Sequence, residues 1–418
     1  MSGAKRIQAP RGTFDVLPED AAAREAVERE ARRVLEGAGY GRIETPAFEA
    51  TELFARGVGE ATDIVQKEMY SFDDGGGRSV TLRPEGTAPV CRAYVEHGMH
   101  KQPQPARLWY LSNFFRRERA QAGRYRQFWQ VGAEAIGSDD PAVDAELIVL
   151  LAELLDGLQV RGLRLRLSSL GSPETRARYR DELQAYLRDH AERLAPEVRQ
   201  RIELNPLRAF DASDEGTRAV MEGAPRLLDR LTAEDLDHFT AVRDLLDTAD
   251  VPYEVDGTLV RGLDYYTRTV FEFESAELGA QSGVAGGGRY DGLVEALGGP
   301  PAAGCGWAAG VERILLASDG PPTAPVPVEL YVAYVGDDRR ADAFALATSA
   351  RQARLNAQLE LAGRSLKGQL KQADRMGARF VAILGDDGAE LKDMESGEQR
   401  AVELDSVVRE VLRGRSAT

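Results

Sequence analysis

Two extended segments joined by an arginine-rich connection constrain this chain more than any other feature. Residues 108–118 and 126–137 flank an Ala-Gly-rich connection at 121–123, so they predict an antiparallel hairpin with a long loop. A face that combines guanidinium groups, an aromatic ring, a glycine gap and a carboxylate does not suit a packed core. It predicts the floor of a pocket for a nucleotide and an amino acid. Because side chains alternate along a strand, that face would carry Arg116, Glu118, Arg126, Phe128, Gln130, Gly132 and Glu134.

The charge of this region differs from that of the whole chain. The 418 residues carry a formal net charge of −15, but residues 101–130 contain seven basic side chains against one acid, Glu118. A local positive cluster in an acidic protein predicts an anionic ligand, such as a nucleotide or the end of a nucleic acid. A solvated turn is the alternative that an arginine cluster leaves open.

The hairpin sequence FRRERAQAGRYRQFWQVGAE at 115–134 resembles motif 2 of class II aminoacyl-tRNA synthetases, and in particular that of the histidyl-tRNA synthetase family. Three further parts of the chain resemble the same family, in the same order. They are TLRPEGTAPV at 81–90, LVRGLDYYTRTVFEF at 259–273, and GGGRYDGLVEALGG at 286–299 followed by GCGWAAGVERIL at 304–315. Two departures stand in motif 2: Ala120 replaces a usual proline, and Trp129 replaces a smaller side chain or histidine but faces away from the pocket by alternation.

The resemblance implies an α+β fold with several parts. A class II catalytic domain would span 1–320 on a mixed, mainly antiparallel sheet, with motif 1 at about 40–56, motif 2 at about 108–137 and motif 3 at about 303–316. A helical insertion would occupy 172–256 within it. A linker at 321–327 would lead to an α/β anticodon-binding domain at 328–418. In motif 1, Pro46 would lie at a dimer interface, although a plain strand ending at this proline fits the residues equally well.

The residues themselves predict the local elements. An amphipathic helix is expected at 20–38, a strand at 40–49, strands dominating to about 137, and a helix at 141–157. Residues 171–256 are charged and helical in period, and DGPPTAPVP at 319–327 predicts a stiff spacer. Beyond it we expect a strand at 329–335, helices at 339–356 and 365–376, a strand at 380–385 and a terminal helix.

The implied reaction is ATP-dependent attachment of L-histidine to tRNA(His) through a histidyl-adenylate, with release of AMP and diphosphate. The chain has no GxxxxGK[ST] phosphate loop, so a different set of positive groups must hold the triphosphate. The alternative is a non-catalytic, histidine-sensing regulatory paralogue of ATP phosphoribosyltransferase. Such paralogues typically lack the C-terminal domain and have eroded arginines, whereas Arg116, Arg261 and Arg313 are all present here.

Site roles follow from matching each motif position. Arg116 would grip the α-phosphate, and Arg261 would replace the catalytic metal of other class II enzymes; both are the catalytic candidates. The histidine-binding candidates are Glu85, Gly86, Thr87, Arg116, Gln130, Glu134, Arg261, Tyr265 and Tyr266. The ATP-binding candidates are Arg116, Glu118, Arg126, Phe128 and Arg313, and the candidates for the tRNA acceptor end are Gln121 and Arg124. A surface ion pair of Arg313 with Glu312 or a neighbour, and plain strand aromatics at Tyr265 and Tyr266, are the structural alternatives.

The C-terminal part has a basic face of its own. Four residues spaced by three or four positions fall on one side of a helix and are the candidates for the tRNA anticodon: Arg364, Lys367, Lys371 and Arg375. A solvated helix face is the alternative on spacing alone. As phosphate contacts, these residues would make binding sensitive to salt.

Composition excludes several other functions. Only Cys91 and Cys305 are present, so a disulfide framework is not expected, and the four histidines lie outside the motifs, which argues against a metal site. We therefore expect ATP with Mg²⁺ as substrate, and no tightly bound metal or organic cofactor. The N-terminus lacks a signal-peptide core, which predicts a cytoplasmic protein without membrane association. A homodimer is implied by the resemblance alone.

Overall fold

The structure of the chain is a computed structural model that describes residues 6–59, 62, 64–212, 214–259, 263–279, 282–319 and 327–415. It divides into two compact units, Met1–Thr323 and Ala324–Thr418. Residues 321–326 of the linker expected at 321–327 lie outside the described residues. Each unit has its own sheet and its own apolar core.

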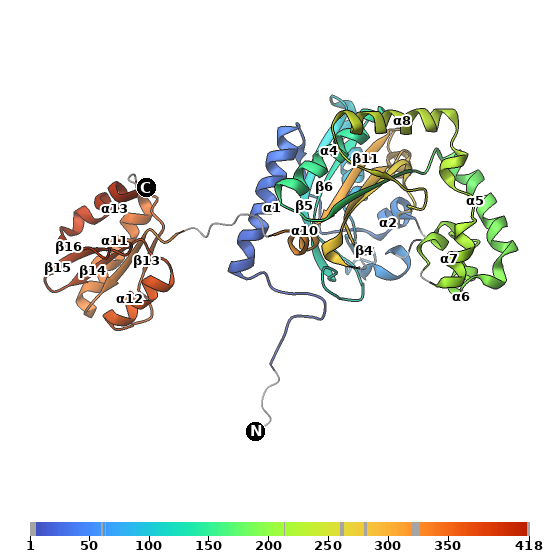
Figure 1. Ribbon diagram of the computed structural model, residues 1–418. Helices are drawn as coiled ribbons and strands as arrows, with labels where there is room; N and C mark the ends of the chain where they lie inside the picture. Colours follow the sequence, from blue (N-terminus) through green and yellow to red (C-terminus); the bar gives the residue numbers. More distant parts are fainter. Residues whose placement is uncertain are drawn as a thin grey trace, which may run out of the picture. The chain divides into compact units, whose positions relative to one another are not determined.

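An eight-stranded sheet forms the centre of the first unit (Figure 1). The first and last pairs of strands, β1–β5 and β7–β8, are parallel, and the other neighbours are antiparallel. The expected hairpin forms the pair β5–β6. In spatial order the strands are β1 (Gly41–Arg42), β5 (Ala106–Phe115), β6 (Gln127–Ile136), β11 (Gly304–Gly310), β10 (Gly283–Arg289), β9 (Thr267–Ser275), β7 (Leu163–Ser169) and β8 (Glu254–Val255).

Helices α1 (Pro18–Gly37), α4 (Pro141–Gly157) and α8 (Ala233–Thr248) cover one face of this sheet and bury the largest apolar cluster. The helix expected at 141–157 is confirmed; Asp140 caps its first turn by accepting from the Ala142 N–H at 2.8 Å, and Pro141 suits the first helical position. Alternation along β6 sends Val131 and Ala133 into this cluster. The residues between them therefore face the opposite side of the sheet.

The opposite face carries a thinner cover. Helices α3 (Thr87–Glu96) and α9 (Leu293–Ala296) pack there with Tyr110 and Phe114 of β5. A small antiparallel sheet lies beyond them, in the order β2 (Phe48–Ala50), β4 (Ser79–Leu82) and β3 (Tyr70–Asp73). Helix α2 (Thr51–Val58) follows β2, and helix α10 (Val311–Ala317) follows β11. The site described below is built on this face.

Two expectations for the first 137 residues were wrong. The strand expected at 40–49 is two short strands in different sheets, because β1 pairs with β5 and β2 pairs with β4. The buried Arg83 fixes the bend between them, donating to the carbonyls of Thr45 at 2.6 Å and Pro46 at 3.3 Å. The segment to residue 137 is also not dominated by strands, since it contains helices α2 and α3.

A helical segment lies between β7 and β8. It comprises α5 (Pro173–Asp189), α6 (Pro196–Arg201), a 3₁₀ turn at Pro206–Asp211, α7 (Glu215–Glu222) and α8. Helices α5 and α7 share an apolar cluster of their own, to which Tyr266 also contributes. Helix α8 behaves differently, since its Phe239 and Val242 belong to the main core.

The second unit has three layers. Its sheet runs β13 (Ala357–Leu359), β12 (Leu330–Tyr334), β14 (Phe380–Gly385), β15 (Gly388–Asp393), β16 (Gln399–Val402). Helices α11 (Arg340–Gln352) and α13 (Val407–Arg415) pack on one face and α12 (Leu366–Arg375) on the other. The expected strands and helices are confirmed, whereas β13 and the hairpin β15–β16 were not anticipated.

Candidate active site

A buried carboxylate, Glu134 of β6, is the centre of the site. Its side chain is fully buried, and it accepts hydrogen bonds from the hydroxyls of Thr87 at 2.8 Å and Tyr290 at 2.8 Å. Burial raises the pKa of Glu134 to about 8, although both hydroxyls favour the charged form and so lower it. A buried carboxyl group held in this way favours a ligand that can donate a hydrogen bond to it.

A second carboxylate, Glu85, lies at the start of α3. It accepts from the backbone N–H groups of Thr87 at 2.8 Å and Ala88 at 3.0 Å, so it satisfies donors that a helix start leaves open. Burial raises its pKa despite these bonds. The Tyr265 hydroxyl lies 3.5 Å from it. Two buried acids with few cations beside them favour a cationic group in the same pocket.

Gln130 supplies an unsatisfied acceptor between these groups and the surface. It is one strand period before Gly132 and two before Glu134, on the same face of β6. Its Oε1 is buried and has no hydrogen-bond partner among the described residues. Buried acceptors of this kind are rare in folded proteins, and one that faces a cavity indicates a missing donor from a ligand.

Glycines leave room for the side chains of Glu134 and Tyr110. A Cβ added to Gly306 of β11 would lie 1.7 Å from Glu134 Oε2, and one added to Gly132 would lie 2.3 Å from the Tyr110 ring. Gly86, one of the histidine-binding candidates, is held in the same way, because its Cβ would lie 2.4 Å from Tyr110. These positions admit no side chain without moving the carboxylate or the ring that lines it.

Tyrosine side chains pack around these two carboxylates. The rings of Tyr265 and Tyr290 meet edge to face with centroids 5.9 Å apart, and those of Tyr265 and Tyr266 are 4.8 Å apart. Tyr266 is buried, but its ring also belongs to the apolar cluster of the helical segment. Tyr290 donates directly to Glu134, and its role beside this carboxylate was not assigned from the sequence.

Sequence reasoning missed Tyr110. It lies on β5 opposite Gly132, and its hydroxyl is 3.5 Å from Glu134 Oε1. Burial raises its pKa well above the usual value, so it stays a hydroxyl donor. The signal was available, since an aromatic residue paired with a glycine on the pocket face of the hairpin fills the space that the glycine leaves.

A cavity of about 610 Å³ lies next to these residues along the same sheet and shares Gln130 with them. It is lined by most of the residues expected to bind ATP, by Gln130, and by backbone of β10 and β11. The guanidinium of Arg116 is anchored by donating from Nε to the Pro84 carbonyl at 2.8 Å and stands 5.2 Å from the Phe128 ring centroid. From the candidate set, the lining includes Arg116, Glu118, Arg124, Phe128, Gln130 and Arg313.

Arg313 enters the cavity from the first turn of α10. Its Nε donates to the Gly283 carbonyl, and burial together with the positive charge of Arg124 lowers its pKa. The alternative pairing with Glu312 is not what the structure has: Glu312 accepts from Arg24 at 2.6 Å and from the Trp129 N–H at 3.0 Å. Cations brought this close to one another favour an anionic ligand between them.

Of the remaining candidates, Arg124 lines the cavity, whereas Gln121 and Arg126 are not among its lining residues. Gln121 is exposed at the tip of the β5–β6 connection, and Arg124 bonds Glu118 at 3.3 Å. Arg126 is instead held beside Gly12 and directs its Nε to the Glu118 carbonyl at 3.4 Å. Arg261, the second catalytic candidate, lies outside the described residues, so its position relative to Arg116 and Arg313 stays a prediction.

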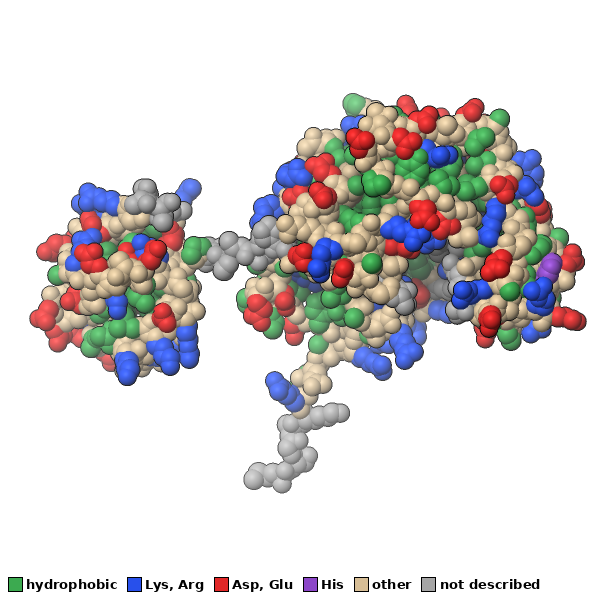
Figure 2. All heavy atoms as spheres, viewed as in Figure 1, with side chains coloured by type: hydrophobic (Ala, Val, Ile, Leu, Met, Phe, Trp, Pro, Cys, Tyr) green, Lys and Arg blue, Asp and Glu red, His purple; other side chains and the backbone are tan. Residues whose placement is uncertain are grey.

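The four basic residues expected to meet the anticodon are all exposed, on or just before α12. Figure 2 shows basic side chains gathered over this part of the second unit. Arg364 differs from the others because it pairs with the buried Glu360 at 3.2 Å. Lys367, Lys371 and Arg375 extend from the helix itself.

Comparison with known proteins identifies the chain. The model of the family "Histidyl-tRNA synthetase" matches residues 12–314, and that of "Anticodon binding domain" matches residues 329–413. A protein named Histidine--tRNA ligase from Halothermothrix orenii is 45% identical over 415 residues, covering 97% of this chain and 99% of that protein. The chain belongs to the histidyl-tRNA synthetase family.

Other members of the histidyl-tRNA synthetase family agree along the whole length. The Histidine--tRNA ligase of Halorhodospira halophila is 49% identical over 419 residues, covering 98% of each chain. The crystal structure of apo histidyl-tRNA synthetase from S. aureus superposes with a TM-score of 0.80 at 36% identity, covering 97% of this chain and all of that one. The α+β class II fold, with a separate C-terminal anticodon-binding domain, is therefore confirmed for this histidyl-tRNA synthetase family member.

Metal clusters and membrane-spanning helices do not occur among the described residues. In this part of the chain, no group of three or more His, Cys, Asp or Glu side chains is placed to hold a metal ion. Helices that combine the length and the apolar character needed to cross a bilayer are likewise missing from the same residues.

Proposed function

We propose that this chain attaches L-histidine to tRNA(His) in an ATP-dependent reaction, through a histidyl-adenylate, releasing AMP and diphosphate. The observation that carries the proposal is the position of Gln130. It lines the cavity that holds Arg116 and Arg313, and it shares a strand face with Glu134 in the adjoining pocket. An activated amino acid and a nucleotide must meet at such a junction.

The pocket suits histidine at both of its polar ends. Glu85, Thr87 and the open Oε1 of Gln130 would receive the α-ammonium group. Glu134 would accept from a ring nitrogen, with Tyr266 near the other. An amino acid that lacks these donors would leave buried acceptors unpaired, which can give discrimination of roughly 10⁴-fold or more without editing.

The reaction would proceed in two displacements. The histidine carboxylate attacks the α-phosphorus of ATP, and diphosphate leaves; a ribose hydroxyl at the tRNA 3′ end then attacks the activated carbonyl, and AMP leaves. Arg116 would hold the α-phosphate, Phe128 would stack on adenine and Arg313 would meet the triphosphate. Arg261 would neutralise charge at the phosphorus, while Mg²⁺ enters with ATP as substrate. Positioning and fixed positive charge supply the catalysis.

The remaining parts would serve the nucleic acid and assembly. We take 1–320 as the catalytic domain with an insertion at 172–256, 321–327 as the linker and 328–418 as the anticodon-binding domain. Gln121 and Arg124 would contact the tRNA acceptor end, and the basic face of α12 the anticodon. A protein with this task belongs in the cytoplasm.

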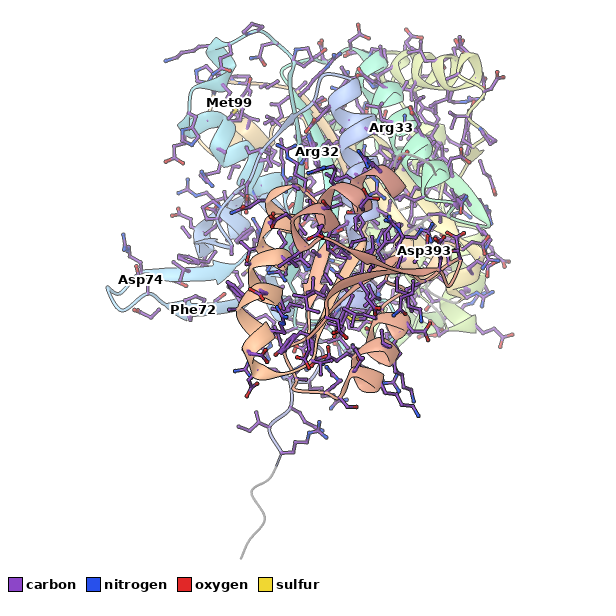
Figure 3. The ribbon with its side chains drawn as sticks, turned by 90° about the vertical axis from the view of Figure 1, so that its left-hand side faces the viewer. Arg32, Arg33, Phe72, Asp74, Met99 and Asp393 are labelled. Atoms are coloured by element: carbon purple, nitrogen blue, oxygen red, sulfur yellow. The ribbon has the colours of Figure 1, made fainter. Side chains whose placement is uncertain are left out.

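A homodimer is also proposed, through the small sheet β2–β4–β3. Phe48 and Phe72 are 52% and 48% exposed on it, with ring centroids 6.4 Å apart. Figure 3 shows that the β3–β4 hairpin, on which Phe72 and Asp74 are labelled, extends away from the rest of its unit. Paired aromatic rings on a projecting sheet favour a second copy of the chain as their cover.

The regulatory alternative is not favoured. The full-length relatives at 45% and 49% identity are named as ligases, and the chain has the C-terminal domain and the arginines that such paralogues typically lose. A solved structure titled as an ATP phosphoribosyltransferase regulatory subunit/histidyl-tRNA synthetase from Bacillus halodurans has 23% identity, which carries the shared fold alone.

Exchange of radioactive diphosphate into ATP, run with each amino acid in turn, tests the proposal. Exchange should require histidine alone. Arg261→Ala and Arg116→Ala should abolish it, whereas the adjacent Arg117→Ala should not, because Arg117 is exposed. Tight histidine binding with no exchange for any amino acid would instead favour the regulatory function.

A further inference from the structure

The N-terminal segment Pro10–Phe14 lies against the connection between β5 and β6. It begins with a tight turn in which the Thr13 N–H donates to the Pro10 carbonyl at 3.0 Å. Gly12 occupies the third position of the turn with φ +86°, a conformation that glycine adopts without strain. We call residues 10–14 the N-terminal strap.

Backbone hydrogen bonds join the strap to the nucleotide cavity in two steps. The Arg126 N–H donates to the Gly12 carbonyl at 2.7 Å, and the Arg116 N–H donates to the Arg126 carbonyl at 3.0 Å. The backbone of Arg126 is thus hydrogen-bonded on both sides, as the backbone of a central strand in a sheet is. Arg116, at the end of this sequence of bonds, lines the cavity.

The strap also packs closely against the connection. A Cβ added to Gly12 would lie 2.8 Å from Arg126 Cγ and 3.3 Å from Ala120 Cβ. Ala120 is the position at which the family usually has proline. The strap therefore covers Ala120, a small residue in the middle of the connection.

An aromatic anchor fixes the end of the strap. The rings of Phe14 and Tyr125 are 4.5 Å apart, and the Arg24 guanidinium lies 5.6 Å from the Phe14 ring and 5.9 Å from the Trp129 ring. Arg24 in turn pairs with the buried Glu312. Phe14 keeps 41% of its surface exposed, so its contacts serve the connection more than they serve the core.

We propose that the N-terminal strap is a positioning element of the active site, with Gly12 and Phe14 holding the β5–β6 connection in the arrangement that binds ATP. Neither residue touches the cavity. This inference rests on the proposed function, because it concerns the same nucleotide site. Without the strap, Arg126 loses one of its two backbone partners, and the segment that carries Arg116, Glu118 and Arg124 gains freedom.

Variants of Phe14 separate this role from a purely structural one. Phe14→Ala should raise the ATP KM in diphosphate exchange by ~10-fold, because a small displacement of binding groups suffices for that. Histidine affinity should not change, and Phe14→Tyr should restore the ATP KM. Ile7→Ala, three residues before the strap and 95% exposed, is the control. Equal ATP KM values for Phe14→Ala and Ile7→Ala would overturn the proposal.

A glycine pair provides an independent comparison. Gly12→Ala adds both backbone strain and a clash with Arg126, whereas Gly98→Ala adds strain alone, since φ is +60° there and only Lys101 Cδ lies within 4 Å, at 3.9 Å. Only Gly12→Ala should raise the ATP KM. An equal effect of the two substitutions would contradict the proposal.

Limited trypsin digestion followed by mass spectrometry gives a readout that needs no activity. The connection contains Arg117, Arg119, Arg124 and Arg126 as cleavage sites. In Phe14→Ala, cleavage there should be ~10-fold faster at an unchanged rate of cleavage elsewhere. If the wild-type chain shows no exchange but Phe14→Ala accelerates this cleavage, the proposed function is wrong, whereas the role of the strap in holding the connection is supported. An unchanged cleavage rate at the connection in Phe14→Ala would overturn the proposed role of the strap.

Discussion

The hydroxyl of Tyr290 donates a 2.8 Å hydrogen bond to Oε2 of Glu134, and both groups are buried beneath the pocket wall. The donor comes from the end of β10 and the acceptor from β6, two strands that are separated by β11. The bond therefore fixes the orientation of the carboxylate across a strand that contributes only glycine beneath it.

Removing this donor should weaken histidine binding. Tyr290→Phe keeps the ring but leaves one carboxylate oxygen without its partner, which costs about 1–3 kcal/mol. We expect the histidine KM to rise by about five- to 150-fold, with a smaller effect on the ATP KM. The control is Tyr94→Phe, whose hydroxyl bonds Gln104 at 3.1 Å. Steady-state exchange kinetics measure both, and an unchanged histidine KM would contradict the role of Tyr290.

Adding one methyl group to the floor should close the pocket. In Gly306→Ala, the new Cβ would stand 1.7 Å from Glu134 Oε2, so the carboxylate must move. We expect histidine binding, measured by calorimetry, to fall by ~100-fold or more. Gly41→Ala, on strand β1 with its nearest atom at 3.9 Å, should bind histidine normally. Normal binding by Gly306→Ala would show that the carboxylate is not where histidine binds.

Glu134 should make the stability of the unliganded chain depend on pH. The folded chain keeps its proton to a pKa of about 8, whereas the unfolded chain releases it near 4.5. The folded state therefore binds more protons between these values, and the free energy of unfolding falls as pH rises from 4.5 to 8.

Glu134→Gln has no proton to release and removes this dependence. The free energy of unfolding of Glu134→Gln minus that of wild type should increase by several kcal/mol as pH rises from 4.5 to 8. Above pH 8 this difference should stay constant. Urea unfolding at pH 5, 6.5 and 8.5 measures the difference, and Glu25→Gln, which is exposed, is the control. A constant difference between wild type and Glu134→Gln would be inconsistent with a buried, protonated Glu134.

The basic face of α12 should contribute to tRNA binding but not to adenylate formation. Lys367→Gln with Lys371→Gln should raise the tRNA KM and reduce the slope of log affinity against log salt by about 1 for each phosphate that is no longer neutralised. Diphosphate exchange should not change. Arg409→Gln, exposed on α13, is the control. If the slope of log affinity against log salt is the same for the double lysine variant and for Arg409→Gln, the basic face of α12 is a solvated surface that does not contact tRNA.

Sedimentation at micromolar concentration should detect the dimer. Phe72→Asp places a charge on the aromatic patch and should shift the chain toward monomer, whereas Phe344→Asp, 60% exposed on α11, should leave its mass unchanged. Wild-type chain that sediments as a monomer would exclude this interface.

The hairpin and its polar face could be predicted because both depend on alternation within one segment. Residues 127–136 form a strand on which Gln130, Gly132 and Glu134 share a face, and the helix at 141–157 was predicted to the residue. Trp129 also faces away from the pocket, against the main core.

Contacts between distant segments could not be predicted in this way. Tyr110 and Tyr290 reach Glu134 only because β5, β6, β11 and β10 are neighbours in the sheet. The bend at Pro46 depends on Arg83, 37 residues further along the chain. The hairpin β15–β16 was missed because its outward side chains are charged and its buried ones, Ala389 and Leu391, are few.

Helix α8 sets a limit on how this protein could be recombined with its relatives. It lies within the segment 172–256, yet Phe239, Val242 and Leu246 fill the main core, and His238 stands 3.5 Å from the buried Asp144 of α4. A chimera that exchanged the whole segment would remove apolar side chains that belong to the main core of the first unit. An exchange that ends before Thr232, the N-cap of α8, would instead transfer helices α5 to α7 and leave α8 in the main core.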